Sequence, residues 1–209
     1  MSSLSPARVA ILESAITALE EPPHEVNVRR VAQIAKRSRQ AVYLHFASRA
    51  ELLIALARYT DERLDLETHL APVREARDAD DLLRRYARFL AVYNPLLYTV
   101  VRAADAMRHR DAAVAEAWND RLRNRQQGGR AVTTRLARWG ALAPGWTTRT
   151  AGDWLTAQGS VKVWEELVLD LGYSARRFER MMTRVFVGAL LHRPATPGTG
   201  VEPRTGTKL

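Results

Sequence analysis

Apolar residues recur at steps of three and four along most of this chain, which is the spacing that gathers side chains on one face of an α-helix. No stretch shows the strict two-residue alternation that indicates a half-buried β-strand. With 209 residues, the chain is long enough to bury a substantial core in one domain or in two small ones. The pattern therefore predicts an all-α protein.

Helix start and stop signals divide the chain into three parts. Residues 1–68 predict short helices, the fourth of which begins with a capping box at Ser48 to Glu51 and runs on toward Thr68. Residues 69–192 predict longer helices, and residues 193–209, rich in Pro, Gly and Thr, predict a disordered tail. The longer helices are expected over residues 80–93, 95–108, 111–142, 147–171 and 174–192, with a kink or a break at Gly128-Gly129.

Residues 27–46 contain five basic side chains and no acidic ones, in two short helical stretches joined by a tight turn. A helix that enters the DNA major groove needs flanking cations, small or polar residues at its start and apolar residues behind it. Because the segment has all three features, it predicts a helix-turn-helix motif presented to DNA. The alternative is a solvated basic surface on an ordinary helical bundle. The basic residues are Arg29, Arg30, Lys36, Arg37 and Arg39.

In such a motif, the first turns of the second helix reach the base edges. Arg39 and Gln40 stand there, and their side chains suit bidentate contacts to guanine and to adenine, respectively. The other candidates carry groups that can donate to phosphates without reading the base sequence. They are Arg29 near the start of the first helix, Ser38 in the turn, and Tyr43, His45 and Arg49 farther along.

The charge balance favours an anionic partner. The chain has 32 Lys and Arg against 23 Asp and Glu, a formal net charge of +9, which suits nucleic acid or an anionic membrane surface. The longest uncharged run, residues 89–101, contains Pro95 and is shorter than the roughly 20 residues of a membrane span. Cys is absent and no signal sequence is evident at the start. We therefore expect a cytoplasmic protein with no membrane partner.

Common catalytic patterns are missing from the sequence. It has no His-Glu-x-x-His, no phosphate-binding glycine loop, no Gly-x-Ser-x-Gly and no Cys nucleophile. No pair of its five His residues has the helical spacing of metal ligands. We expect no enzymatic activity, no cofactor and no metal, so the alternative function is that of a sequence-neutral nucleic-acid-binding helical protein.

A stretch from Pro6 to Tyr59 resembles the N-terminal domain of the TetR family of bacterial transcription regulators. The resemblance rests on Val31-Ala32, Ala35, Ser38, Val42 to Phe46, Ser48-Arg49 and Glu51 to Leu53. It implies an all-helical homodimer in which the small N-terminal domain binds a palindromic operator in double-stranded DNA. It also implies that the larger C-terminal domain binds a small molecule that weakens DNA affinity, with repression as the usual outcome. The family's usual DNA contacts fall on Arg29, Ser38, Arg39, Gln40, Tyr43, His45 and Arg49.

The turn of the motif departs from the Gly-Val that is common in this family, because this chain has Lys36-Arg37. A non-glycine residue in a left-handed turn is strained by about 1 kcal/mol. Two arrangements of Arg37 remain open. Its stem could lie over apolar surface where a valine would be buried, or the side chain could point outward and add a contact to a DNA phosphate.

Two apolar seams near the end of the chain predict broad helix contacts. One runs from Trp154 to Leu171 along a single continuous helix, and the other lies on the last helix. Helices that are apolar over so broad an arc need more than one neighbour, and the resemblance implies a four-helix dimer interface. The residues expected in this interface are Val161, Trp164, Val168, Phe178, Met182, Val185 and Ala189.

Large side chains between residues 89 and 154 are the candidates for a ligand pocket, although any one of them could simply belong to the core. Mostly apolar walls with a few polar groups would suit an apolar or amphipathic small-molecule effector. The candidates are Phe89, Tyr93, Tyr98, Met107, Trp118, Trp139 and Trp154.

Overall fold

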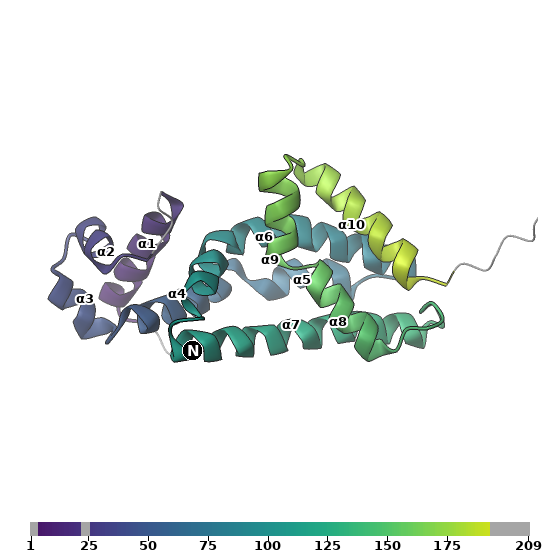
Figure 1. The fold of residues 1–209 in the computed structure, drawn as a ribbon, viewed down its shortest axis with the longest axis horizontal. Helices are drawn as coiled ribbons and strands as arrows, with labels where there is room; N and C mark the ends of the chain where they lie inside the picture. Colours follow the sequence, from purple (N-terminus) through teal and green to yellow (C-terminus); the bar gives the residue numbers. More distant parts are fainter. Residues whose placement is uncertain (1–3, 22–25, 193–209) are drawn as a thin grey trace, which may run out of the picture.

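The structure is a computed structural model that describes residues 4–21 and 26–192, so the tail expected at residues 193–209 lies outside the described part. The all-α prediction is confirmed there, since the only strand-like pairing in those residues is an isolated bridge between Leu142 and Leu191. Figure 1 shows a small group of helices at one end and a larger bundle beside it. The helices are α1 (Pro6–Glu20), α2 (Val28–Ile34), α3 (Arg39–His45), α4 (Arg49–Leu64), α5 (Leu66–Arg74), α6 (Ala79–Met107), α7 (Ala112–Arg138), α8 (Thr148–Gln158), α9 (Val161–Trp164), the π-helical segment η1 (Glu165–Asp170) and α10 (Ala175–Leu190).

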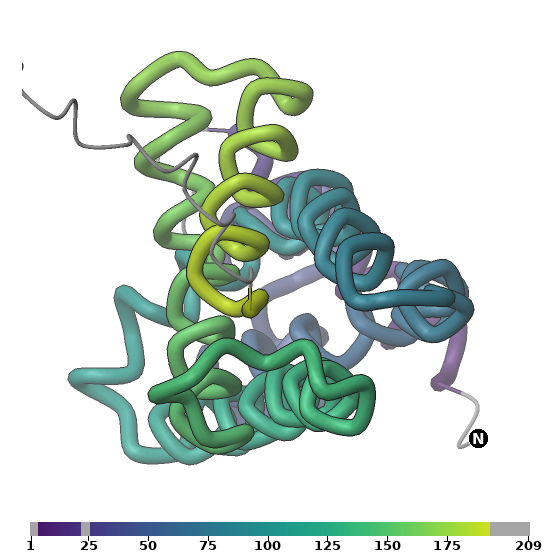
Figure 2. Tube along the Cα trace, turned by 90° about the vertical axis from the view of Figure 1, so that its right-hand side faces the viewer, coloured from purple at the N-terminus to yellow at the C-terminus, as the bar shows by residue number. Residues whose placement is uncertain are grey.

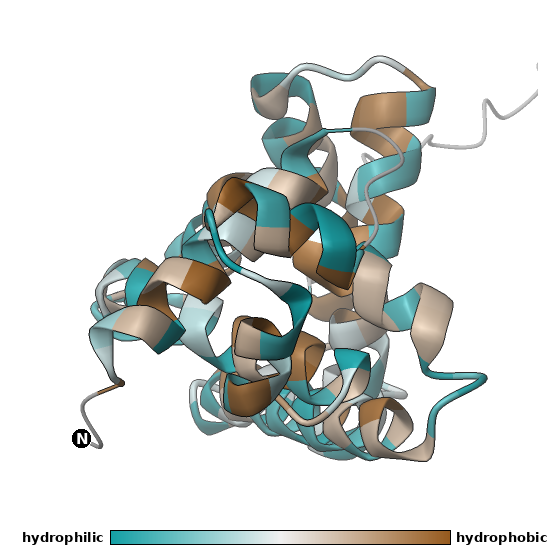
Figure 3. Ribbon diagram, turned by 90° about the vertical axis from the view of Figure 1, so that its left-hand side faces the viewer, coloured by the Kyte–Doolittle hydropathy of each residue, from teal (hydrophilic) through white to brown (hydrophobic). Residues whose placement is uncertain are grey.

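The short helices α1 to α3 and the first half of α4 share one hydrophobic core. Each begins at a side chain that accepts a hydrogen bond from a main-chain N–H of the first turn. Figure 3 views the molecule from this end and shows both hydrophilic and hydrophobic segments on these short helices. Full burial of a Leu, Ile or Phe side chain contributes about 1.5 to 3 kcal/mol, so this core fixes how the helices pack. Its fully or almost fully buried members include Leu12, Leu19, Val31, Phe46, Leu52 and Leu56.

Helix α4 is shorter than predicted, because it ends at Leu64 rather than continuing to Thr68. Asp65 has a left-handed backbone, with φ of 45°, which ends α4 and changes the direction of the chain. The Asp65 carboxylate then caps α5 by accepting from the N–H of Thr68 at 3.3 Å. A helix-capping aspartate therefore sets the corner, and the apolar pattern alone did not reveal it.

The prediction of two helices separated at Pro95 is wrong, since α6 runs without interruption from Ala79 to Met107. A proline inside a helix costs about 3 kcal/mol or more, because it removes one hydrogen bond and crowds the preceding turn. Pro95 is exposed, whereas Leu90 and Ala91 before it and Leu97 and Val100 after it are buried. Helix α6 also packs against α1, α4, α5, α7, α9 and α10, so tertiary contacts outweigh the local cost.

Helix α7 likewise passes through Gly128 and Gly129, so the pair does not break the helix, and α7 ends at Arg138 rather than at Leu142. The helix predicted over residues 147–171 does break. Gly159 ends α8, and the side chain of Ser160 starts α9 by accepting from the N–H of Val163 at 3.3 Å. The seam from Trp154 to Leu171 is therefore divided between α8, α9 and η1, and the prediction of one continuous helix is wrong. In Figure 2, α10 lies beside α6, and α7 lies beside α8.

Candidate DNA-binding surface and ligand cavity

The turn between α2 and α3 is held by main-chain hydrogen bonds and by two capping side chains. Asn27 accepts from the N–H of Arg29 at 3.0 Å, and Ser38 accepts from the N–H of Ala41 at 3.1 Å. The N–H of Arg37 donates to the carbonyl of Ala32 at 2.9 Å. These bonds fix the angle between the two helices of the motif.

Helix α3 presents one exposed face and anchors the other. Val42 and Phe46 are buried beneath it, while Arg39, Gln40 and Tyr43 are exposed, Tyr43 by 41%. Because residues 39, 40 and 43 lie on one side of the helix, the side chains predicted to read DNA share one surface. Of the other predicted contacts, Arg29, Ser38 and Arg49 are also exposed and His45 is half-buried.

The sequence analysis missed one residue of this surface and one residue that supports it. Leu44 is 87% exposed on the same face of α3 as Gln40, where an apolar side chain can touch a thymine methyl group. Its helical spacing from Gln40 and Tyr43 was the available signal. Arg8 of α1 donates to the carbonyl of His45 at 2.9 Å and lies over the ring of Phe46 at 4.3 Å, so it fixes the end of α3. No local pattern links Arg8 to residues 37 positions away.

The departure at Lys36-Arg37 has a defined geometry. Lys36 takes the left-handed conformation, with φ of 52°, and Arg37 is exposed. Of the two arrangements considered for Arg37, the structure has the outward one.

Replacing Arg37 with Val is expected to reduce the dependence of operator affinity on salt. Each phosphate contact contributes about 0.9 to the slope of log affinity against log salt concentration, because binding releases condensed counterions. Arg37→Val should therefore lower the slope by about 0.9 for each Arg37 side chain that contacts a phosphate. Fluorescence anisotropy at four or more salt concentrations measures this slope, and an unchanged slope would exclude the phosphate contact. Arg149→Ala, which removes an exposed cation at the far end of the bundle, is the control.

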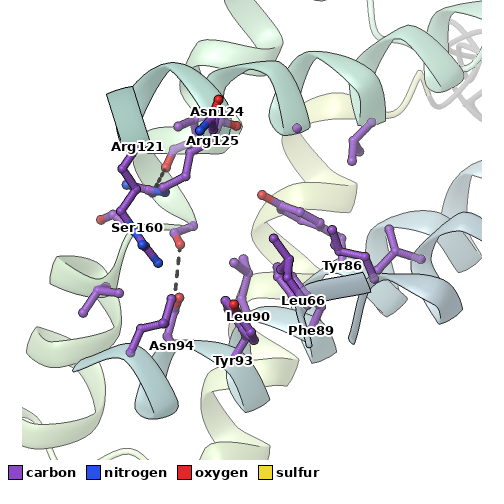
Figure 4. A pocket seen from close by; sticks show the side chains of 18 of the residues that line it. Leu66, Tyr86, Phe89, Leu90, Tyr93, Asn94, Arg121, Asn124, Arg125 and Ser160 are labelled. Carbon is purple, nitrogen blue, oxygen red and sulfur yellow. Dashed lines mark hydrogen bonds between the residues drawn. The ribbon is translucent and has the colours of Figure 1, made fainter. Parts of the chain in front are cut away.

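The larger bundle encloses a cavity of about 430 Å³ between α4, α5, α6, α7 and the start of α9 (Figure 4). Cavities of about 300 to 1,000 Å³ suit small-molecule ligands. Three of the candidate pocket residues line it: Phe89, Tyr93 and Trp118. Most of the remaining wall is apolar and includes Leu66, Leu70, Leu82, Leu90, Leu97 and Val132.

Four candidate pocket residues do not line this cavity, because each packs elsewhere. Tyr98 contacts Trp164 and donates to Glu165 at 2.9 Å. Met107 packs against the core of the short helices, and Trp139 is 41% exposed. Trp154 packs against Trp146 and Phe186.

The polar groups of the cavity come mainly from α6 and α7. Arg121 of α7 forms two hydrogen bonds with Asp61 of α4, at 2.5 and 2.8 Å. Tyr93 has a buried hydroxyl for which the described residues provide no hydrogen-bond partner. Burial raises the pKa of Tyr93 to about 12, so its hydroxyl stays protonated and can act as a donor.

Several residues expected in a dimer interface pack inside the protomer instead. Phe178, Met182 and Trp164 are buried, and Phe178 and Met182 belong to the core beneath α10. Val161 lines the cavity. Of the seven, Val161, Val168, Val185 and Ala189 are half-buried, and the last three do not line the cavity. The nearby Leu169 and Leu171, which are 50% and 60% exposed, were not among the expected residues.

The described part of the chain provides little support for other kinds of site. It contains no group of three or more His, Cys, Asp or Glu residues arranged to hold a metal ion. Among its helices, none combines the length and the apolarity that are needed to cross a membrane.

The chain has a helix-turn-helix motif whose second helix exposes Arg, Gln and Tyr, and a larger helical bundle follows this motif. This combination defines a DNA-binding transcriptional regulator. Residues 11–56 match the sequence model of the family described as bacterial regulatory proteins, tetR family. This match confirms the resemblance of the N-terminal domain to the TetR family that the sequence motifs predicted.

Solved structures of regulators have the same fold over almost the whole chain. A regulator from Saccharomonospora viridis in complex with choline is 17% identical, with a TM-score of 0.75, covering 91% of this chain and 100% of its own. A TetR transcription regulator from Haloarcula marismortui is 17% identical, with a TM-score of 0.67 and coverages of 90% and 100%. FadR from Bacillus subtilis in complex with stearoyl-CoA is 17% identical, with a TM-score of 0.66 and coverages of 87% and 98%. No curated protein sequence matches the chain.

Proposed function

We propose that this regulator is a repressor that binds a palindromic operator as a homodimer and releases it when a small molecule occupies the cavity. The observation that carries the DNA part is the exposed face of α3, where Arg39, Gln40 and Tyr43 lie together above buried Val42 and Phe46. Arg39 and Gln40 would read base edges, while Arg29, Arg37, Ser38, Tyr43, His45 and Arg49 would contact phosphates.

Dimerisation follows from the geometry of DNA. Two reading helices about 34 to 36 Å apart meet the same groove one turn along, and a palindrome presents the same bases to both. The outer surfaces of α9, η1 and α10 are the proposed dimer interface. It would contain Val168, Val185 and Ala189, which the sequence predicted there, and the exposed Leu169 and Leu171.

The ligand response would pass through α4. The first half of this helix lies in the core of the short helices, where Leu52, Leu53 and Leu56 are buried. Its second half reaches the cavity, where Asp61 lines the wall and holds Arg121. A ligand that alters the position of Asp61 would therefore change the placement of the reading helix. Two regulators of the same fold were solved with stearoyl-CoA and with choline, which supports the proposal that this regulator also binds a small molecule.

We further propose the division into a DNA-binding domain at residues 1–68 and a ligand-binding and dimerisation domain at residues 69–192. The left-handed Asp65, at the corner between α4 and α5, lies close to that boundary. The regulator would act in the cytoplasm and without catalysis.

Sequence-specific binding is tested by comparing DNA from upstream of the chain's own coding sequence with scrambled duplex of equal length. At two salt concentrations, we expect the upstream DNA to bind at least about 10³-fold more tightly, as specific regulators do. Both affinities should fall as salt rises, because both depend on phosphate contacts. Equal affinities for the two duplexes would instead favour the sequence-neutral nucleic-acid binder.

A further inference from the structure

The cavity wall contains a cation, Arg125, for whose side chain the described residues provide one hydrogen bond and no carboxylate. Arg125 of α7 lines the cavity and is half-buried. Its guanidinium donates to the main-chain carbonyl of Thr156 at 2.7 Å, and the described residues offer it no carboxylate. Burial, and to a lesser degree the neighbouring Arg121, lowers the pKa of Arg125, while Tyr86 partly offsets them. The charged side chain is therefore held in a place that disfavours its charge.

The other cations of the cavity wall already have partners. Arg121, Arg74 and Lys162 pair with carboxylates, and Arg135 donates to two main-chain carbonyls. Among the described residues that line the cavity, Asp61 is the only acidic one, and it accepts two hydrogen bonds from Arg121. Arg125 and Arg135 are therefore the cavity cations without a carboxylate partner among the described residues, and Arg125, with one hydrogen bond against two for Arg135, is the guanidinium with most donors left for a ligand.

The rest of the wall is suited to an apolar body. Leu66, Leu82, Leu90 and Leu97 contribute aliphatic surface, and Phe89 and Trp118 contribute aromatic surface. Figure 4 shows Tyr86 reaching from α6 across the cavity toward α7, the helix that carries Arg125. An apolar cavity with a guanidinium on one wall that still has free donors is complementary to an amphipathic anion.

Resting on the proposed function, we propose that the effector is an amphipathic anion: an apolar chain or ring system with one carboxylate-like group bound by Arg125. A guanidinium binds a carboxylate through two parallel hydrogen bonds, which is the strongest neutralising contact available to it. A cationic ligand would be repelled by Arg125 and Arg121, and a neutral alcohol would leave the guanidinium without a counter-charge. Ligands that have the same apolar chain length but different head-group charge therefore distinguish an anionic effector from a cationic or neutral one.

The test uses three probes with the same ten-carbon chain: decanoate, 1-decanol and decyltrimethylammonium. Binding to the full-length chain is measured by isothermal titration calorimetry below the aggregation concentration of each probe. Decanoate is expected to bind at least about tenfold more tightly than either other probe, since a hydrogen bond to a charged group contributes more than a neutral one. Arg125→Met should remove this preference. Arg123→Met, which changes an exposed arginine two positions away on the same helix, is the matched control and should retain it.

The results separate this inference from the proposed function. If 1-decanol or decyltrimethylammonium binds as tightly as decanoate, the anionic class is wrong, while an effector cavity still stands. If none of the three binds, the inference is also wrong, and the operator experiment continues to test the DNA-binding function independently. If Arg125→Met fails to fold, the ranking of the three probes on the unmodified chain still decides. If Arg125→Met folds and keeps the preference for decanoate, Arg125 is not the residue that binds the anion.

Discussion

Operator affinity is expected to fall by about 10³-fold when Arg39, Gln40 and Tyr43 are all replaced by alanine, while affinity for scrambled duplex changes much less. Two bidentate base contacts contribute roughly 1 to 3 kcal/mol each, and every 1.4 kcal/mol is about tenfold in affinity. Tyr43 adds a phosphate contact, whose loss also weakens binding to scrambled DNA. The ratio of the two affinities, measured by anisotropy at one fixed salt concentration, should therefore approach one.

The variant should remain folded, which makes the result interpretable. All three side chains are exposed, whereas α3 is anchored by Val42 and Phe46, and exposed substitutions usually change stability by no more than about 0.5 kcal/mol. Circular dichroism and the melting temperature check this. Arg149→Ala is the control for loss of a cation and should leave the affinity ratio intact. A folded triple variant that still prefers its operator fully would remove the basis for assigning DNA reading to α3.

The short helices were predictable because local signals and burial agree there. Asn27 and Ser48 are residue types that favour helix starts, and each caps a predicted helix in the structure, as does Ser38, which was assigned to the turn. The buried positions Val42 and Phe46 are four apart, so they share one face of α3, while Arg39, Gln40 and Tyr43 are exposed. When propensity, capping and apolar spacing all favour one arrangement, a single sequence is enough to predict it.

The larger bundle was predicted less well because distant contacts determine it. Pro95 and Gly128 are strong local signals for an interruption, yet the packing of α6 and α7 overrides both. Conversely, α8 ends at Gly159, where the chain packs tightly, since a Cβ on Gly159 would lie 3.0 Å from a methyl group of Leu90. Helical spacing in the sequence does not determine which aromatic residues face the cavity. Arg125 was not predicted as a cavity residue, because the chain contains many arginines and no local sequence pattern distinguishes this one.

Adjacent glycines in α7 are expected to respond oppositely to alanine. A Cβ on Gly129 would lie 2.7 Å from the carbonyl oxygen of Gly152 and 2.4 Å from Oγ1 of Thr156, both on α8. Because a carbonyl in a packed helix cannot move alone, α7 and α8 would have to separate. Overpacking of this kind costs about 1 to 3 kcal/mol. At roughly 2 to 4 °C per kcal/mol, Gly129→Ala should lower the melting temperature by several degrees.

Gly128 is the matched control, since it has the same residue type, the same helix and a neighbouring position. A Cβ there meets no atom within 4 Å, so Gly128→Ala gains helix propensity of about 1 kcal/mol without a clash and should raise the melting temperature. Calorimetric unfolding of the two variants and of the unmodified chain gives the comparison. The two glycines then differ only in what lies opposite them, because local propensity favours alanine at both. Stabilisation of both variants would show that α7 and α8 do not pack as closely as the distances between Gly129 and α8 require.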